Sequence, residues 1–445
     1  MTDGTRNKLA ALFAQYVPVS PRSLGALRRP QFLNLVVQQF LSLAATYAIS
    51  FASMAKVVES TASGIHAALT ILSVVVPGLL FGLLGGVTVD RVSRRTMLKA
   101  TNIMRGLIAL LAPLYMGSLA PEAIVPVILA VNFLLSAVGQ FNFPAEAALI
   151  PYLVANEELT AANSAFNVSY LAAIAFGGGV IGPLSVRLLG PEWTYFFGGV
   201  LFAVTLLPLA AVTKDPPPRE RAMRKSRYAR LRHVVAFFAD VEEGVSFALS
   251  NSAVTVGILS LISQTALALS LAAVFPVVLD TRFGIAIYNL PLLLLPGGLG
   301  AGLGLLWLLS RAAARRRRTF FVVVGNALMA SGLLGLTLAV WLPEVGVWGI
   351  VGSSLPIGAG FVISYISAKS ILQEEPPAYL CGRVVSLQLT LNNVVSLLPT
   401  IVAGWALDVL GPLVVFVTAT VLFGSLVLLG GTWVRRSPDL PRSCP

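Results

Sequence analysis

Long apolar runs alternate with short polar segments along most of this chain. A helix that crosses the hydrocarbon core of a bilayer needs roughly 20 mostly apolar residues, and twelve runs approach or exceed that length. These runs cover residues 31–55, 64–88, 96–117, 122–143, 161–189, 193–212, 253–279, 285–309, 319–340, 347–368, 386–410 and 412–434. The pattern therefore predicts an all-α polytopic membrane protein with twelve transmembrane helices.

Composition supports this prediction. The chain has 445 residues, of which 56% are hydrophobic and only 11% are charged, whereas roughly 25% of the residues of a soluble domain are charged. The first 29 residues are polar and basic and contain no short apolar core that ends in small residues, so we expect no cleavable signal peptide.

The basic residues indicate how the spans are oriented. If both termini are cytoplasmic, only Lys56, Arg187 and Arg282 fall in outer loops and only Arg105 falls well inside a span. All other lysines and arginines then lie on the inner side, as the positive-inside rule requires. The net charge of +12 would suggest nucleic acid as a partner of a soluble protein. In a membrane protein the positive charge instead follows from the orientation of the spans, so we expect the lipid bilayer as a partner and no nucleic acid.

The two halves of the chain repeat each other loosely. Pro77-Gly78 in the second span matches Pro296-Gly297 in the eighth, and Gly190-Pro191 after the fifth span matches Gly411-Pro412 after the eleventh. Between the halves lies a proline-rich and basic segment that cannot bury a core, and its residues 228–250 carry apolar positions at helical spacing. The predicted domains are an N-terminal tail (1–29), a six-helix half (30–212), a basic cytoplasmic linker with an amphipathic helix (213–250), a second six-helix half (251–434) and a C-terminal tail (435–445).

A compact charged segment, Gly86-Val-Thr-Val-Asp90-Arg91-Val-Ser-Arg94-Arg95, joins the second and third spans. An acid such as Asp90 is stabilised near the start of another helix, typically by 0.3–1 kcal/mol. The three arginines would bridge to carboxylates or carbonyls across the inner mouth. Alternatively, Arg94 and Arg95 only mark the cytoplasmic side. Glycines at 78, 82 and 86 recur on one face of the second span, which predicts close helix packing there.

Further motifs follow in order along the chain. They are Gly178-Gly-Val-Ile-Gly182-Pro183 in the fifth span, Phe143-Pro144-Ala145-Glu146 with Glu158-Leu159-Thr160 between the fourth and fifth spans, Asp240-Val-Glu-Glu-Gly244, and Gly382-Arg383-Val384-Val385-Ser386. Together with the charged segment, which resembles motif A, these motifs resemble the major facilitator superfamily, and within it the enterobactin-exporter and macrolide-efflux branch. The resemblance runs from about Pro30 to Val434, and residues 178–183 resemble part of antiporter motif C.

The resemblance implies two parallel six-helix halves that bind a small molecule between them and open alternately to each side. It assigns a cytoplasmic gate to Gly86, Asp90, Arg91, Arg94, Arg95, Gly382 and Arg383. It assigns helix packing and gating to Gly178, Gly182 and Pro183. A functional monomer in the bacterial cytoplasmic membrane, with both termini inside the cell, is the expected state.

Uncharged polar residues recur about every fourth position in three spans, so each set lies on one helix face. They are Asn34, Gln38, Ser42 and Thr46 in the first span, Asn132, Ser136 and Gln140 in the fourth, and Ser260 and Gln264 in the seventh. Polar groups that face lipid are unfavourable, so the stripes should face a wet cavity or form hydrogen bonds between helices. The resemblance favours the cavity, because these spans line the path in the superfamily.

Ionisable residues are nearly absent from the predicted spans. Many relatives carry an acid at the position of Thr46, and its loss here argues against simple proton antiport. Asp90 and Glu146 are the candidate protonation sites near the inner mouth, although Glu146 fits a solvated loop acid better. We expect Arg105 to snorkel to the cytoplasmic face. The cysteines and histidines are too few for a metal site, so neither metal nor cofactor is expected.

The favoured function is secondary active transport, most simply efflux of a small amphipathic or drug-like molecule of siderophore or antibiotic type, with a proton as the possible coupling ion. Import of a small solute and movement of a lysolipid by the same fold remain open. An enzyme is not expected, because His66 and His233 lie on opposite sides and no nucleophile–base pair is apparent. A non-transporting sensor is the remaining alternative.

Overall fold

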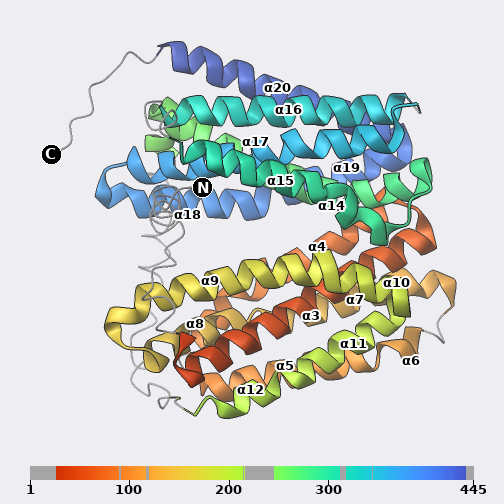
Figure 1. The fold of residues 1–445 in the computed structure, drawn as a ribbon, viewed down its shortest axis with the longest axis vertical. Helices are drawn as coiled ribbons and strands as arrows, with labels where there is room; N and C mark the ends of the chain where they lie inside the picture. Colours follow the sequence, from red (N-terminus) through yellow and green to blue (C-terminus); the bar gives the residue numbers. More distant parts are fainter. Residues whose placement is uncertain are drawn as a thin grey trace, which may run out of the picture. The chain divides into compact units, whose positions relative to one another are not determined.

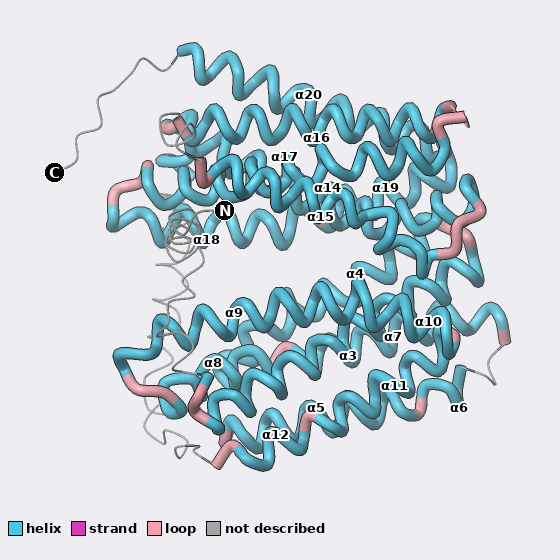
Figure 2. Tube along the Cα trace, in the orientation of Figure 1, coloured by secondary structure: helices cyan, strands magenta, loops and turns pink. Residues whose placement is uncertain are grey.

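The computed structural model describes residues 27–89, 92–116, 120–213, 215, 245–310, 317–342 and 344–436. These residues form helices joined by short loops (Figures 1 and 2). Within them, twelve helical segments are long and apolar enough to cross a membrane. The predicted all-α, twelve-span membrane fold is therefore confirmed.

The described helices group into two compact units. Unit 1 comprises residues 1–62 and 69–224, and unit 2 comprises residues 63–68 and 225–445. The first six spans are α3 (Pro30–Thr61), α4 (Gly64–Val89), α5 (Arg94–Leu110) with α6 (Ala112–Met116), α7 (Pro121–Gly139) with α8 (Asn142–Leu153), α9 (Leu159–Phe176) with a π-helical turn (Gly177–Ile181) and α10 (Gly182–Leu189), and α11 (Pro191–Val204) with α12 (Leu206–Ala211).

The last six spans follow the same plan. They are α14 (Ser252–Phe283), α15 (Leu290–Leu308), α16 (Arg318–Trp341), α17 (Gly346–Glu374), α18 (Ala378–Val395) with α19 (Leu397–Leu410), and α20 (Pro412–Arg436). Several helices exceed the predicted apolar runs; α3, for example, continues through Lys56 and Glu59 to Thr61. The Lys56 ammonium lies 2.6 Å from the Glu192 carboxylate. This ion pair stabilises the charged end of α3, which lies beyond the apolar run that predicted the span.

The sequence repeat corresponds to matching local structure. Gly190 and Gly411 both have φ of +86°, a conformation that glycine adopts without steric cost. Each is followed by a proline at the first position of the next helix, where the missing N–H is not needed. The two Gly-Pro pairs therefore form the same turn after the fifth and eleventh spans.

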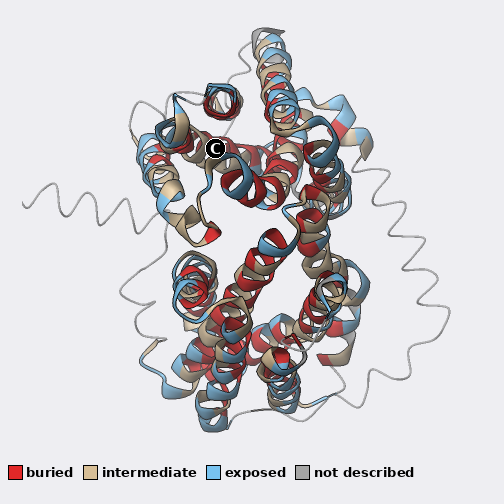
Figure 3. Ribbon diagram, turned by 90° about the vertical axis from the view of Figure 1, so that its right-hand side faces the viewer, coloured by how far each residue is buried: buried red, intermediate tan, exposed pale blue. Residues whose placement is uncertain are grey.

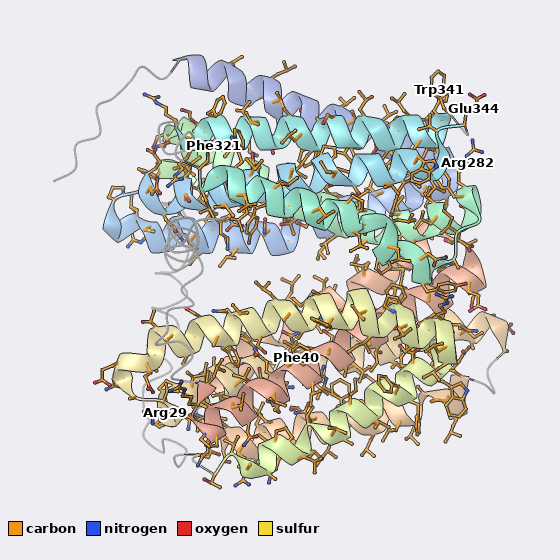
Figure 4. All side chains as sticks on the ribbon, viewed as in Figure 1. Arg29, Phe40, Arg282, Phe321, Trp341 and Glu344 are labelled. Carbon is orange, nitrogen blue, oxygen red and sulfur yellow. The ribbon has the colours of Figure 1, made fainter. Side chains whose placement is uncertain are left out.

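Each unit has its own apolar interior, visible as the buried helix faces in Figure 3. In unit 1, Phe32, Leu98 and Leu149 are fully buried and belong to one core cluster. Phe40 on α3, labelled in Figure 4, packs against α9: its ring centroid lies 6.1 Å from that of Phe176. In unit 2, an equivalent cluster joins α14, α17 and α18.

The predicted amphipathic helix lies mostly outside the described residues, because only 245–250 of the 228–250 segment belong to them, and these six are helical. At the start of α3, Arg29 pairs with Glu158 at 2.6 Å (Figure 4). This ion pair connects the first span to the turn before α9, and it explains one acid of the motif around residues 158–160.

Candidate functional site

The charged segment after α4 is described only in part. Asp90 and Arg91 lie outside the described residues. Ser93 is the N-cap of α5, and its hydroxyl accepts a hydrogen bond from the backbone N–H of Thr96 and donates one to the Asp215 carboxylate. Asp215 also accepts from the backbone N–H of Arg95 at 3.1 Å. A linker carboxylate thus stabilises the first turn of α5, where an acid is favoured by the helix dipole.

The described arginines of the segment bond inside unit 1. Arg94 is 3.8 Å from the Asp215 carboxylate and lies over the ring of Tyr152 at 5.4 Å, and the Arg95 guanidinium donates to the carbonyl of Ala210. Bridging across the inner mouth stays a prediction. Asp215 follows the sixth span closely, so it is tethered near the arginines and binds them locally.

The glycines predicted to pack the second span differ in their surroundings. At Gly82 and Gly86 an added Cβ would meet no described atom within 4 Å, whereas at Gly85 it would lie 2.5 Å from the carbonyl oxygen of Gln140. The close approach is therefore at Gly85. Gly382 is exposed and Arg383 is half-buried, both one turn inside the N-terminus of α18.

The polar stripe of the first span points into unit 1. Gln38 and Ser42 are buried, while Asn34 and Thr46 are half-buried. The Ser42 hydroxyl donates to the side-chain oxygen of Asn102 on α5 at 2.9 Å. These contacts place Ser42 in a hydrogen-bond network inside unit 1, and cavity lining by the stripe stays a prediction.

Arg105 on α5 is the centre of this buried network. Its side chain donates to the hydroxyl oxygens of Ser42, at 3.2 Å, and of Thr46, and its guanidinium lies 4.3 Å from the centroid of the Phe202 ring. The residue is only 3% exposed. The prediction that Arg105 snorkels to the cytoplasmic face is therefore wrong: hydroxyl groups and an aromatic ring inside unit 1 hold the charge.

Glu146 on α8 faces the same network. It is 3% exposed, lies within the fourth candidate span, and is close enough to interact electrostatically with Arg105 and to contact Gln38. The reading of Glu146 as a solvated loop acid is thus wrong, because α8 continues the fourth span and turns this residue inward. An acid and a base of unit 1 are buried together within membrane-spanning segments.

The fourth-span stripe also makes contacts between helices. Asn132 is buried, and its side-chain oxygen accepts from Ser53, which is bonded to the Tyr195 hydroxyl. Ser136 donates to the carbonyl of Val74 on α4 at 2.6 Å. Gln140 is half-buried and lies against Gly78.

Unit 2 contains a similar buried network. Ser260 and Gln264 on α14 are at most 1% exposed. The Gln264 amide donates to Ser364 on α17, and Asn326 on α16 donates to Ser260, at 2.8 and 2.9 Å. Ser260 and Gln264 thus form hydrogen bonds between helices, as the alternative to cavity lining predicted. Cavity lining by these two residues stays a prediction.

The glycine-rich motif of the fifth span forms a π-helical turn over Gly177–Ile181, a feature that frequently occurs at functional sites. An added Cβ at Gly177 would lie 2.6 Å from the carbonyl oxygen of Ala44, and one at Gly182 would lie 2.8 Å from the Cβ of Phe51. Both glycines let α3 approach closely. Gly178 has only an ordinary contact, so the tight position is Gly177, and the buried Pro183 begins the next turn.

A second carboxylate caps a helix in unit 2. Asp408 on α19 accepts hydrogen bonds at the start of α4 from the Ser63 hydroxyl, the Gly64 N–H and the Ile65 N–H, at 2.7, 2.6 and 3.0 Å. Beside it, an added Cβ at Gly64 would lie 2.6 Å from the carbonyl oxygen of Gly404. Residues 63–68 belong to unit 2, so Asp408 caps the turn at which the chain enters unit 2 after α3.

We expect Asp408→Ala to lower the thermal stability of the purified protein, because three donors at the start of α4 lose their acceptor. Loss of such a cap costs about 1–2 kcal/mol. Melting in detergent measures the effect, with Asp280→Ala, at an exposed aspartate near the end of α14, as the matched control. Equal melting temperatures for both variants would contradict the capping role.

Several of these residues carry no signal in the sequence. Asp215, Asp408, Tyr195 and Asn326 belong to no periodic pattern, and their partners lie far away in the chain. The described residues contain no group of three or more histidines, cysteines or acids that could hold a metal ion. The arrangement has the chemistry of a membrane protein with charged and polar groups packed inside its helical units.

Comparison with known proteins agrees with this fold. The family model of the Major Facilitator Superfamily matches residues 35–400. Three solved structures are similar over nearly their whole length: a mutant of the nucleoside transporter NupG (TM-score 0.65, 15% identity, 90% of this chain and 99% of the other), the POT family transporter PepTSo (0.65, 12%, 92% and 97%) and a D-xylose-proton symporter (0.61, 16%, 92% and 97%). No curated protein sequence matches the chain.

Proposed function

The chain belongs to the Major Facilitator Superfamily, and we propose that this secondary transporter exports a small amphipathic or drug-like molecule of siderophore or antibiotic type. Two conformations of the paired halves would open the substrate site alternately to each side of the membrane. Import of a small solute and movement of a lysolipid are the alternatives within the same fold. The similar solved structures are too distant in sequence to choose among these, since they share only the fold.

The motifs support export. Residues 143–163, 240–244 and 382–386 resemble the enterobactin-exporter and macrolide-efflux branch, and residues 178–183 resemble part of an antiporter motif. The π-helical turn at Gly177–Ile181 adds a structural irregularity at that motif. Irregular helices next to tight glycine contacts suit a span whose packing changes during transport.

The observation that carries the proposal is the buried pair of Arg105 and Glu146. Ionisable residues inside membrane spans are costly and usually belong to substrate or proton pathways. Thr46, where many relatives carry an acid, accepts a hydrogen bond from Arg105, and Glu146 supplies a carboxylate to the same network. We therefore propose that protonation of Glu146 couples transport to a proton gradient, with Asp90 as a second candidate site.

The charge pattern is the basis for the proposed orientation of the protein in the membrane. Basic residues concentrate in the segments that become cytoplasmic when both termini lie inside the cell. The bacterial cytoplasmic membrane and a functional monomer fit the resemblance. Labelling of single cysteines placed in the tails, in intact and in opened cells, measures this orientation directly.

Transport by the purified protein tests the function. The protein should be screened by thermal shift against metabolites and antibiotics, and each stabilising compound should be followed in proteoliposomes with and without an imposed pH gradient. Efflux predicts that protein whose cytoplasmic side faces out accumulates the compound when the lumen is acidic. Accumulation independent of the gradient would refute proton coupling, and a folded protein that moves no compound would favour the sensor alternative.

Asp90→Asn tests the proposed gate. We expect at least a tenfold loss of transport, about 1.4 kcal/mol in the gate equilibrium, because the neutral amide interacts more weakly with a helix N-terminus. Expression and melting temperature should change little, since Asp90 would act only in one conformation. Transport in proteoliposomes is the measurement, and Asp408→Asn serves as a control at another capping acid. Wild-type rates for Asp90→Asn would refute the gate assignment.

A further inference from the structure

Several residues of the predicted polar stripes are buried inside the units, whereas other polar residues of the spans are exposed. Helix α9 of unit 1 carries exposed polar side chains on one face. Asn163 and Asn167 are exposed, and Tyr170 and Ile174 are half-buried. Their spacing of four, three and four residues places all of them on the same face.

A different face of α9 is suited to lipid. Val168 is 48% exposed. It follows Asn167 directly and is therefore turned about 100° from it around the helix axis. Val168 thus lies on a different face from the exposed amides, whereas Leu171, which is 65% exposed and four residues after Asn167, lies at the border of their face.

The polar face belongs to a candidate membrane span. The fifth candidate span covers Asn156–Leu189, and at 1.5 Å per residue Tyr170 lies about 20 Å from its first residue. An amide such as that of Asn167 is unfavourable next to hydrocarbon. Its exposure therefore indicates a surface that meets water or a ligand during transport.

Aromatic rings from two further helices stand beside this face. Phe143 on α8 is 52% exposed, and its ring is edge-on to Tyr170, with centroids 6.2 Å apart. The buried Phe166 supports it at 6.3 Å, and the hydroxyl of Tyr47 on α3 interacts with that of Tyr170. The supported rings are held in place before any ligand arrives, which lowers the entropy lost on binding.

We propose that Tyr47, Phe143, Asn163, Asn167 and Tyr170 form an aromatic–amide face that binds the transported molecule and selects planar aromatic compounds with hydrogen-bonding edges. The planar part stacks on the face of one of the two rings, Phe143 or Tyr170, and meets the other edge-on, and the asparagine amides bond its polar edge, each as donor and acceptor. The inference rests on the proposed transport function, because it names the substrate class of that site.

Binding of fluorescent probes to the purified protein in nanodiscs tests the proposal. The planar aromatic probes are ethidium, umbelliferone and fluorescein, which differ in charge, and the non-aromatic probes are radiolabelled glucose and leucine. The variants are Tyr170→Leu, Asn167→Leu and Tyr170→Phe. Val168→Ala on the other face of α9 is the matched control. Transport of every probe is followed in parallel in proteoliposomes.

At least one aromatic probe should bind, and Tyr170→Leu and Asn167→Leu should each weaken it about tenfold, a loss typical of one stacking or buried polar contact. Tyr170→Phe, which keeps the ring, and Val168→Ala should stay within about twofold of the wild type. Unchanged affinity in both leucine variants overturns the aromatic–amide face. Transport of glucose or leucine without binding of any aromatic probe overturns the substrate class but spares transport, and movement of no probe by folded protein overturns both.

Discussion

Glu146→Gln is expected to abolish gradient-driven transport and to lower the melting temperature of the protein. The amide cannot release a proton, and it leaves the Arg105 guanidinium buried without a carboxylate nearby. Removing one of two buried opposite charges leaves the other uncompensated, which destabilises the fold. The remaining donors of Arg105 still bond Ser42 and Thr46, so the variant should fold, although less stably.

A double variant separates coupling from stability. Arg105→Gln combined with Glu146→Gln removes both charges, and replacing a whole buried pair by neutral groups is often nearly neutral for stability. We therefore expect the double variant to melt closer to the wild type than either single variant, while it still lacks proton-driven transport.

Melting in detergent and substrate exchange in proteoliposomes measure the two effects. If Arg105 and Glu146 serve only proton coupling, the double variant should still exchange substrate across the membrane without a pH gradient. Full gradient-driven transport by Glu146→Gln would refute the assignment of Glu146 as the proton site. Additive losses of stability in the three variants would show that Arg105 and Glu146 do not interact.

Gly177→Val is expected to prevent correct packing of the fifth span against the first. Its Cβ would lie 2.6 Å from the carbonyl oxygen and 2.8 Å from the Cα of Ala44. Both neighbours are backbone atoms of α3, so no rotamer change relieves the overlap. Overpacking of a core typically costs 1–3 kcal/mol, and a backbone clash at a helix crossing falls at or above the top of that range.

Gly179→Val is the matched control for this prediction. Gly179 belongs to the same π-helical turn, but a Cβ there would meet no described atom within 4 Å. Both substitutions carry the same cost in helix propensity, so their difference isolates the contact with Ala44. We expect a monodisperse elution profile and near wild-type melting for Gly179→Val, and aggregation or a large loss of melting temperature for Gly177→Val. Similar behaviour of the two variants would refute the tight crossing.

The spans were predictable because the requirement is local. Each membrane crossing needs about 20 apolar residues in succession. A single continuous segment, such as residues 319–340, shows this property. The inner position of the basic segments, which stays a prediction, likewise rests on counting Lys and Arg between spans. Ends were less predictable: α3 continues past its apolar run because Lys56 finds Glu192 in a distant helix.

The environment of individual polar residues was not predictable in this way. A spacing of four residues places Gln38, Ser42 and Thr46 on one helix face, but it does not say which neighbour that face meets. The structure turns it towards Arg105 and Glu146, so a predicted cavity stripe becomes part of a buried network. Conversely, Asn167 and Tyr170, which no stripe included, lie on an accessible face of α9.

Pattern and composition therefore predict twelve membrane spans, which the structure confirms, and local motifs predict the superfamily, which the family model shows, since both depend on residues near one another in the chain. The orientation and the gate stay predictions. Long-range packing assigns the partners: Asp215 to Arg94, Asp408 to the start of α4, and Glu146 to Arg105. Each partner comes from a helix or linker remote in sequence. Hydrophobic periodicity specifies how a helix meets lipid or protein in general, whereas a hydrogen bond or ion pair needs the positions of two particular side chains.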